Sequence, residues 1–321
     1  MKERIITMQL NDERDVALFA KYNEINNSYK KKCVYHVGID AGFFSELGAM
    51  MECMLYCYAH RIKFVLYADD ANFADKNGWE DFFVPFCEMS HNILNRNSNY
   101  RYNVNYGYRY QIRNKLLRKM EKADYLTADI FNICIPREYA CKRIVKWEMF
   151  KINGSIFDEF GKLDRIALRY NEKTKKEIDQ CIEELQLPRD YISVQFRGGD
   201  KKLEFENLNR VEEVMDVIEN NNKGIYSLFI LSDDYEFIEQ VQKEYTQYRI
   251  YTLTEKDERG YINEKFNKLK GVKKRRQLIK LFAAVDICLK SIIHFGNEQT
   301  CLNNYIKSRK EMGYICANKA V

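Results

Sequence analysis

Short apolar runs alternate with helical periodicity along most of the chain. In the first half, the pattern predicts a buried strand at 32–39 (KCVYHVGI), a strongly apolar helix at 44–59 and a short strand at 63–67. A helix with apolar residues around much of its surface usually packs against a sheet. Three further segments are predicted in this half, an aromatic loop, a polar Tyr-rich excursion and a basic helix, at 77–86, 97–107 and 110–122.

The second half shows the same alternation more clearly. A charged helix is predicted at 171–187, ending before Pro188, and connects the halves. The predicted strands lie at 191–196, 225–231, 248–253 and 285–290. The predicted helices lie at 209–219, 235–245 and 277–284, with a last helix from about residue 298 past residue 307.

Strands that alternate with helices indicate parallel sheets with right-handed crossovers. We therefore predict an α/β protein with two Rossmann-like parallel-sheet domains that face a cleft. The first domain is predicted at 1–170 and the second at 171–321. The last helix is expected to pack back on the first domain.

Composition fits two globular domains. The chain has 321 residues, of which 46% are apolar and 31% charged. These values exclude a disordered chain, a collagen-like chain and a short disulfide scaffold. The net charge of +5 is too small to indicate nucleic-acid binding by itself. A non-catalytic nucleotide- or RNA-binding protein nevertheless remains an alternative. The segment 100–122 mixes tyrosines with basic residues, and 268–276 is a basic run.

The ten cysteines are scattered, and no CxxC pair occurs. Cys53 and Cys57 are neighbours on one face of the predicted apolar helix. No metal site is therefore expected. The chain starts Met-Lys-Glu-Arg without an apolar leader, and no run of 18 uncharged apolar residues occurs. With free thiols, these features favour a cytoplasmic protein, at most in peripheral contact with a membrane surface.

Candidate chemistry lies where the predicted strands end, because ligands bind beyond the carboxyl ends of parallel strands. After 191–196 come Arg197, Gly198, Gly199, Asp200 and Lys201. An arginine offers a planar set of donors to phosphate, and two glycines let main-chain N–H groups approach an anion. Asp200 can orient the arginine and Lys201 adds charge. The alternative is a tight turn with a solvated charge cluster.

Two carboxylates, Asp233 and Asp234, follow the strand at 225–231. A carboxylate can accept the two adjacent donors of guanine or the hydroxyls of a ribose. The alternative is that Ser232 or Asp233 caps the helix that begins near residue 235.

The segment 291–300 follows the last predicted strand and supplies His294, Asn297 and Thr300 close to a helix start. Main-chain N–H groups at such a start favour phosphate, although a plain cap by Asn297 is an alternative. In the first half, Gly42 and Phe43 lie between a strand and the apolar helix, with Asp40 and Glu46 as neighbouring carboxylates. Neither GxGxxG nor a GxxxxGK[ST] loop occurs, so a dinucleotide enzyme or P-loop ATPase has no motif support.

Several motifs resemble those of the GDP-fucose-dependent fucosyltransferases with a GT-B fold. This group includes the α1,6-, α1,2- and protein O-fucosyltransferases. The motifs occur in the family's order between about residues 35 and 305. They are GFFSEL at 42–47, SVQFRGGDK at 193–201, LFILSDD at 228–234 and KLFAAVDICLKS at 280–291. The resemblance implies a GT-B-like architecture and transfer of fucose from GDP-fucose.

The resemblance also implies roles for single residues. Arg197 matches the arginine that holds the donor β-phosphate, and Asp200 the acid that supports its loop. Asp233 and Asp234 match an acidic pair near the nucleoside. The segment 291–300 matches a loop that contacts the diphosphate. The segment 42–46 matches a loop that faces the donor sugar and acceptor.

The chain departs from the family pattern in four places. Leu278 or Gln277 replaces an acidic residue that the family often places on the helix before the last strand. The histidine of the family's His-x-Arg is Gln195, and a second arginine is replaced by Gly198. The position of the family's catalytic glutamate falls near Phe205, between Glu204 and Glu206.

We therefore expect an inverting, metal-independent fucosyltransferase of glycan biosynthesis. Arg197 would stabilise the departing diphosphate, and a carboxylate would take the acceptor proton. Glu204 or Glu206 is the expected base, with Glu46 and Asp40 as alternatives. The expected partners are a GDP-sugar and a glycan acceptor, with a lipid-linked acceptor as one option, and no nucleic acid. The main alternative is a GT-B transferase that uses another nucleotide sugar.

Overall fold

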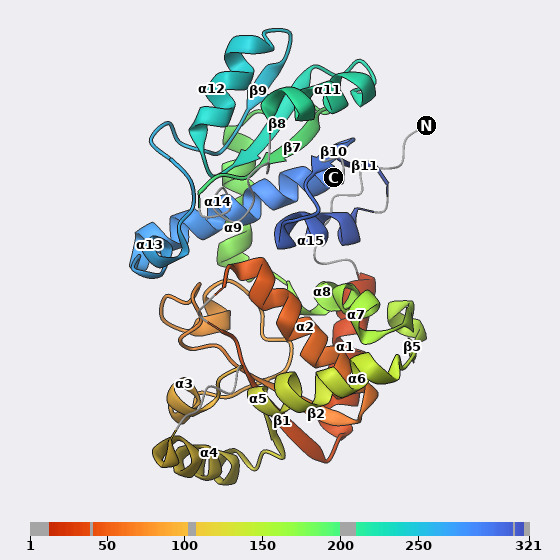
Figure 1. Cartoon of the computed structure of the whole chain (residues 1–321), viewed down its shortest axis with the longest axis vertical. Coiled ribbons are helices and arrows are strands. Elements are labelled where there is room, and N and C mark those ends of the chain that lie inside the picture. The colour runs from red at the N-terminus through yellow and green to blue at the C-terminus, as the bar shows by residue number, and fades with distance from the viewer. Residues whose placement is uncertain (1–12, 39–40, 102–106, 200–209, 311, 318–321) are drawn as a thin grey trace. The chain divides into compact units, whose positions relative to one another are not determined.

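The computed structural model describes residues 13–38, 41–101, 107–199, 210–310 and 312–317. The chain divides into two compact units, Met1–Asn171 and Glu172–Val321 (Figure 1). Each unit has its own parallel sheet, so the predicted α/β class is confirmed. The roles assigned to the two domains, and the packing of the last helix on the first domain, remain predictions.

The first unit is built on a four-stranded sheet in the order β3-β2-β1-β4, with every pair parallel. The strands are β1 (Lys31–His36), β2 (Ile62–Tyr67), β3 (Glu88–Met89) and β4 (Tyr125–Leu126). A separate antiparallel hairpin is formed by β5 (Val145–Trp147) and β6 (Ile152–Gly154). The helices are α1 (Glu13–Ser28), α2 (Phe43–Ala59), α3 (Leu94–Ser98), α4 (Tyr108–Glu121), α5 (Thr127–Asp129), the π-helix η2 (Ile130–Cys134), α6 (Ile135–Cys141), α7 (Ile156–Glu159) and α8 (Asp164–Ala167), with 3₁₀ turns η1 (Gly78–Asp81), η3 (Glu148–Phe150) and η4 (Phe160–Leu163).

The core of the first unit forms where the apolar pattern predicts it. Helix α2 packs on β1 and β2, and eleven of its seventeen residues are buried. The aromatic loop at 77–86 is also buried: Trp79, Phe82, Phe83 and Phe86 are each at most 1% exposed. Burial of such rings stabilises a fold strongly because each removes a large apolar area from water.

The second unit contains a five-stranded sheet in the order β11-β10-β7-β8-β9, again with every pair parallel. The strands are β7 (Ile192–Phe196), β8 (Ser227–Ser232), β9 (Arg249–Tyr251), β10 (His294–Gly296) and β11 (Tyr314–Cys316). The helices are α9 (Glu172–Glu184), α11 (Val211–Asn221), α12 (Tyr235–Glu244), α13 (Asn263–Asn267), α14 (Gly271–Lys290) and α15 (Cys301–Arg309).

One predicted strand is wrong. Residues 285–290 continue α14, and the strand of this region is β10, which begins at His294. A short apolar run fits a buried helix as well as a strand. Here Phe282, Val285 and Ile287 continue the buried surface of one 20-residue helix.

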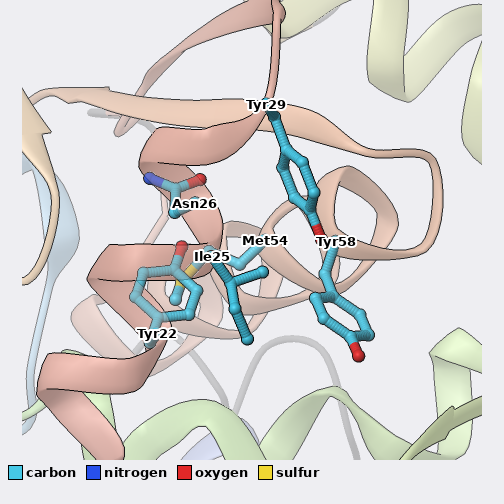
Figure 2. A pocket seen from close by; sticks show the side chains of 6 residues that line it. All are labelled: Tyr22, Ile25, Asn26, Tyr29, Met54 and Tyr58. Carbon is cyan, nitrogen blue, oxygen red and sulfur yellow. The ribbon is translucent and has the colours of Figure 1, made fainter.

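The described part of the chain contains no helix that is both long and apolar enough to cross a membrane. Figure 2 shows a crevice between α1 and α2, lined by Tyr22, Ile25, Asn26, Tyr29, Met54 and Tyr58. The crevice is too narrow to hold a water molecule. It is therefore a packing defect between two helices and offers no room for a ligand.

Candidate functional site

The second sheet reverses its strand order beside β7. From β7 the chain adds β8 and β9 on one side, and then returns to place β10 and β11 on the other. Ligands of open parallel sheets bind beyond the carboxyl ends of the strands at such a reversal. Arg197 directly follows β7, and Asn297 directly follows β10. The topology thus brings two of the predicted donor-binding segments to the same edge.

The side chain of Arg197 is held in place from two sides. Its Nη1 lies 2.5 Å from Oδ2 of Asp233, and its Cζ lies 5.1 Å from the centre of the Tyr261 ring. The side chain remains 19% exposed. The sequence assigned the orienting role to Asp200, which lies outside the described residues together with Lys201. In the structure Asp233, from the neighbouring strand, makes that contact.

Asp233 accepts three hydrogen bonds at once. Besides Arg197, the N–H of Gly198 donates to Oδ1 (2.6 Å) and the N–H of Tyr261 donates to Oδ2 (2.7 Å). Asp234 accepts from the N–H of Glu236 (3.1 Å), caps α12 and is 4% exposed. The capping role that the sequence allowed for Ser232 or Asp233 therefore belongs to Asp234. Contact of either carboxylate with a nucleoside remains a prediction.

The two glycines after Arg197 are required by close packing. Gly199 has φ +58°, and a Cβ built on it would lie 2.1 Å from the carbonyl oxygen of Tyr261. A Cβ on Gly198 would lie 2.8 Å from Cβ of Asp234. Gly260, with φ +84°, packs on Gly199 in the same way. The Arg-Gly-Gly turn is therefore fixed by close contacts with the backbone at 260–261 and with the side chain of Asp234, and it cannot accept larger residues without a shift.

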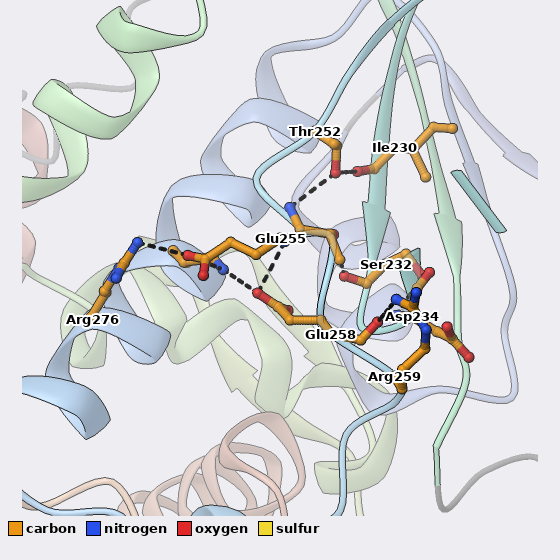
Figure 3. A network of polar contacts seen from close by, with 10 residues as sticks. Ile230, Ser232, Asp234, Thr252, Glu255, Glu258, Arg259 and Arg276 are labelled. Atoms are coloured by element: carbon orange, nitrogen blue, oxygen red, sulfur yellow. Dashed lines mark hydrogen bonds and ion pairs between the residues drawn. The ribbon is translucent and has the colours of Figure 1, made fainter. Parts of the chain in front are cut away.

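The loop that carries Tyr261 follows β9 and is braced by α14 (Figure 3). Arg276 donates to Oε1 of Glu255 (2.8 Å), whose own N–H donates to Oε1 of Glu258 (3.1 Å). The carboxylate of Glu258 also pairs with Lys280. Sequence analysis missed Tyr261. The signal was available, because a Gly-Tyr pair at 260–261 follows the third strand of this unit.

His294 supports the site from inside the protein. It is fully buried, with Nδ1 2.8 Å from Oγ of Ser193 and Nε2 3.0 Å from Oδ1 of Asn303. Burial lowers the pKa of this imidazole to about 4, so the ring is neutral at ordinary pH. The sequence placed His294 among the donor-binding residues. The structure gives it no surface that a ligand could contact.

Thr300 and Asn297 shape the start of α15. Oγ1 of Thr300 accepts from the N–H of Asn303 (3.2 Å) and donates to Oε1 of Gln195 (3.0 Å). Asn297 is 2% exposed, and its carbonyl accepts from the side chain of Asn303 (3.0 Å). Gln195, which replaces the family histidine, thus ties β7 to the helix. The first turn of α15 has no acidic residue, so its N-terminal partial positive charge is not offset there.

The candidates of the first unit have other partners. Oε2 of Glu46 accepts from the N–H of Gly38 (2.9 Å) and pairs with Arg101, and Glu46 is 2% exposed. Phe43 is buried, and its ring centre lies 5.7 Å from that of Phe83. Gly42 precedes α2 and provides no side-chain cap. The other predicted bases, Asp40, Glu204 and Glu206, lie outside the described residues.

Two histidine–aspartate contacts at the edge of the first sheet were not predicted. His36, at the end of β1, has Nε2 2.8 Å from Oδ1 of Asp70 and Nδ1 2.8 Å from the carbonyl of Asn99. Nearby, Nδ1 of His91 lies 2.9 Å from Oδ1 of Asp69. The signal was again positional, since Asp69 and Asp70 directly follow the predicted strand at 63–67.

Among the described side chains, one group of three thiols has the spacing of metal ligands. Sγ atoms of Cys33, Cys53 and Cys57 lie within 4.8 Å of one another, and all three residues are fully buried. Hydrogen bonds from the other two lower the pKa of Cys33 to about 6, whereas burial raises the pKa of Cys53 and Cys57 well above their usual value. A soft metal ion would have to displace both of those protons. Buried thiols also pack as small apolar side chains, and the expectation of metal independence remains a prediction.

An open groove of about 340 Å³ lies beside α4, and none of its lining residues is one that the sequence singled out for the reaction. It is lined by Tyr110, Gln111, Asn114, Lys115, Arg118, Ala128 and Asp129. Arg118 and Asp129 form an ion pair at 2.6 Å, so two of the groove's charges neutralise each other.

Comparisons with known proteins agree with this architecture. The family model "Alpha-(1,6)-fucosyltransferase N- and catalytic domains" matches residues 23–279. NodZ α-1,6-fucosyltransferase co-crystallised with GDP is similar in structure (TM-score 0.52, 10% identity, 87% of this chain and 92% of that chain). Fucosyltransferase NodZ from Bradyrhizobium is also similar (TM-score 0.52, 11% identity, 87% of this chain and 92% of that chain). POFUT1 in complex with GDP is similar as well (TM-score 0.51, 8% identity, 88% of this chain and 95% of that chain).

These structures match the two α/β units with parallel sheets, which confirms the predicted GT-B-like fold class. No curated protein matches the sequence. The family model, however, covers well over half of the chain and includes the Arg197 turn, the strand before Asp233 and the Tyr261 loop. The chain therefore belongs to the α-1,6-fucosyltransferase family and is a glycosyltransferase.

Proposed function

We propose that this protein transfers fucose from GDP-fucose to a hydroxyl group of a glycan, with inversion at the sugar carbon. Family membership supports fucose transfer, and one NodZ α-1,6-fucosyltransferase of similar fold was studied as a crystal soaked with GDP-fucose. The observation that carries the proposal is the fixed Arg197 at the strand-order reversal of the second sheet.

In this proposal Arg197 binds the β-phosphate of the donor. As the bond between fucose C1 and the phosphate oxygen breaks, negative charge grows on that oxygen. A guanidinium already held by Asp233 and the Tyr261 ring stabilises this charge without first having to be ordered. The N–H groups at the start of α15 provide further donors to the diphosphate.

The acceptor hydroxyl attacks C1 from the face opposite the leaving GDP, and its proton passes to a carboxylate. We propose Glu204 or Glu206 for this role, with Asp40 as the alternative. Glu46 is the weakest candidate, because Arg101 and the N–H of Gly38 already occupy its carboxylate. A base must be able to reach the proton that it accepts.

Recognition of guanine requires a carboxylate that can accept its two adjacent N–H donors. Asp233 acts through Arg197, and Asp234 caps α12, so each carboxylate already has partners within the second unit. We keep Asp234 as the candidate for a guanine contact, because it follows β8, the parallel neighbour of the strand that Arg197 follows.

Thermal unfolding with different nucleotides tests the donor. A ligand at 100 times its Kd stabilises a protein by about 2.7 kcal/mol. We expect this shift with GDP and a smaller one with UDP or ADP, and equal shifts would remove the guanine assignment. GDP release from GDP-fucose in the presence of glycans then tests transfer. Arg189→Ala, which changes an exposed arginine between α9 and β7, is the matched control for Arg197→Ala.

Two alternatives make different predictions. A transferase for another nucleotide sugar would release nucleotide faster from that donor than from GDP-fucose. A nucleic-acid-binding protein would be retained on RNA in a salt-dependent manner. The basic run at 268–276 gives that reading little support, because three of its cations are paired, Lys268 with Glu264, Arg275 with Glu177 and Arg276 with Glu255.

Metal independence and cytoplasmic location complete the proposal. We expect activity to survive EDTA, since a guanidinium and helix N–H groups provide positive charge for the diphosphate. Loss of activity in EDTA that Mn²⁺ or Mg²⁺ restores would contradict this. The location is proposed from the free thiols and is tested by fractionation of the source cells.

A further inference from the structure

Helix α4 presents a row of large apolar side chains to solvent. Tyr108, Ile112, Leu116 and Met120 recur at every fourth position and are 76%, 49%, 46% and 57% exposed. The opposite face of the helix is anchored by Leu117, which is fully buried against β1, β2 and β4. Single exposed apolar residues are common on protein surfaces, but a contiguous row of four on one helix marks an interaction surface.

Basic residues flank this row on both sides. At about 100° per residue, Arg109 and Arg113 lie on one side of the row, and Lys115 and Lys119 lie on the other. All four are exposed. The one acidic residue of the helix, Glu121, is half buried and accepts a hydrogen bond from a serine outside α4. The outward face of α4 is therefore apolar in its centre and positive along both margins.

This face is not part of the proposed donor site. It belongs to the first unit and lies beside α3 (Figure 1), whereas Arg197 and its partners belong to the second unit. Its character also differs from that of a helix exposed only to water. Such a helix would carry polar residues in place of Ile112, Leu116 and Met120.

The chemistry of the face selects among possible partners. A second copy related by two-fold symmetry would bring the same basic margins together, and like charges oppose such contact. RNA or DNA would satisfy the basic residues but would leave three aliphatic side chains without an apolar partner, since only Tyr108 can stack on a base. An anionic lipid bilayer satisfies both, with acyl chains for the row and phosphate-bearing headgroups for the margins.

We propose that α4 binds the surface of a bilayer that contains anionic lipids. The helix would lie parallel to the surface, with its apolar row at the boundary between headgroups and acyl chains. The lysine and arginine stems extend to the headgroup level, as is typical of basic interfacial helices. This surface would hold the enzyme beside lipid-linked acceptors, but the binding itself does not depend on the proposed transfer reaction.

Vesicle co-sedimentation of the full chain tests the proposal. We expect binding to vesicles of phosphatidylcholine with about a third phosphatidylserine, none to phosphatidylcholine alone, and weaker binding as salt is raised. The triple variant Ile112→Ser, Leu116→Ser, Met120→Ser should lower the partition coefficient at least about tenfold. The double variant Arg113→Gln, Lys119→Gln should lower it about 25-fold, since each cation near such a surface contributes about fivefold.

Matched control variants lie on the second unit. Lys173→Gln with Lys176→Gln removes two exposed charges from α9, and Val272→Ser with Met312→Ser removes two exposed apolar side chains. Both pairs should leave vesicle binding unchanged. In addition, Leu116→Trp should show a blue shift of its emission on phosphatidylserine vesicles, because the indole leaves water.

Three outcomes would overturn the proposal. The first is absence of binding to the anionic vesicles, and the second is equal binding of the triple serine variant. The third is a concentration-dependent dimer without lipid that the triple variant abolishes, which would assign the face to a second copy. GDP stabilisation, measured on the same variants, reports on the proposed function separately and should not change.

Discussion

Helices α2 and α15, which follow strands of the first and the second sheet, differ in the charge of their first turns. In the first unit, the first turn of α2 contains its own carboxylate, Glu46, which is buried and paired with Arg101. In the second unit, α15 is capped by the neutral Thr300 and has no acid in its first turn, while Arg197 stands at the neighbouring strand end. A helix N-terminus attracts anions.

This difference indicates which edge is available to a ligand. The first sheet fills its anion-attracting position with a protein carboxylate, and the resulting pair is buried. The first turn of α15 contains no such carboxylate, and in the proposed function an anion from outside the chain binds there. We therefore propose that the phosphate groups of a nucleotide sugar bind at the second edge, and we expect the charged groups of the first edge to be mainly structural.

The largest effect is expected for Arg197. Arg197→Ala should lower turnover by roughly 10²–10³, in line with the loss of one preorganised oxyanion donor. Arg197→Lys should rescue little, because an ammonium cannot reproduce the planar pair of donors. The measurement is the rate of GDP release with glycan present, on protein whose circular dichroism matches the parent. A folded alanine variant with full activity would remove this residue from the site.

Glu46→Gln should lower the stability of the protein and leave its affinity for GDP almost unchanged. Removal of one partner from a buried ion pair lowers the free energy of unfolding by about 3 kcal/mol. The affinity for GDP should stay within about twofold, as is usual for changes away from a binding site. Urea unfolding and calorimetry on the same sample check both values. A variant of parental stability that has lost transfer activity would identify Glu46 as the base.

His294 predicts loss of stability in acid. Its pKa is about 4 in the folded protein, below the ordinary value of 6.5, so the unfolded state binds more protons between these two values. Stability is complete above about pH 6.5 and falls towards pH 4, by about 3 kcal/mol. Burial raises the pKa of Asp286 to about 6, which acts in the opposite sense. The test is therefore the difference between parent and His294→Gln, whose stability should depend less on acid. Parallel pH profiles would contradict the assignment.

Gly199→Ala tests the packing of the Arg197 turn. The new Cβ combines a positive φ with a clash against Tyr261, so we expect about 2–4 kcal/mol of destabilisation and weaker GDP binding. Gly224 is the matched control. It also has positive φ (+77°) but open space around it, so Gly224→Ala should cost about 1 kcal/mol and leave GDP binding intact. Equal effects would show that the contact with Tyr261 is unimportant.

The sequence predicted the parts of the fold that depend on local pattern. The apolar helix at 44–59 and the strand at 191–196 appear within one residue of their predicted ends. The strand predicted at 285–290 was wrong because a short, mainly apolar segment does not distinguish a buried helix from a strand. Helix α1 was missed, since its sequence carries only a weak apolar face.

The candidate site was predicted in position but not in its contacts. Arg197 and Asp233 could be placed because both follow strands of one parallel sheet. Their ion pair could not be predicted, because strand order and register are set by packing across the whole unit. Tyr261 and the buried state of His294 were missed for the same reason.

The central claim is that the edge of the second sheet binds the donor through its phosphates, with Arg197 as the main contact. The most direct measurement compares GDP with guanosine, by calorimetry, in the parent and in Arg197→Ala. The parent should bind GDP at least about tenfold more tightly than guanosine, since a hydrogen bond to a charged group contributes about 1.5–3 kcal/mol. In Arg197→Ala most of that preference should disappear, while guanosine binding stays the same. An unchanged ratio of the two affinities in the variant would contradict the account.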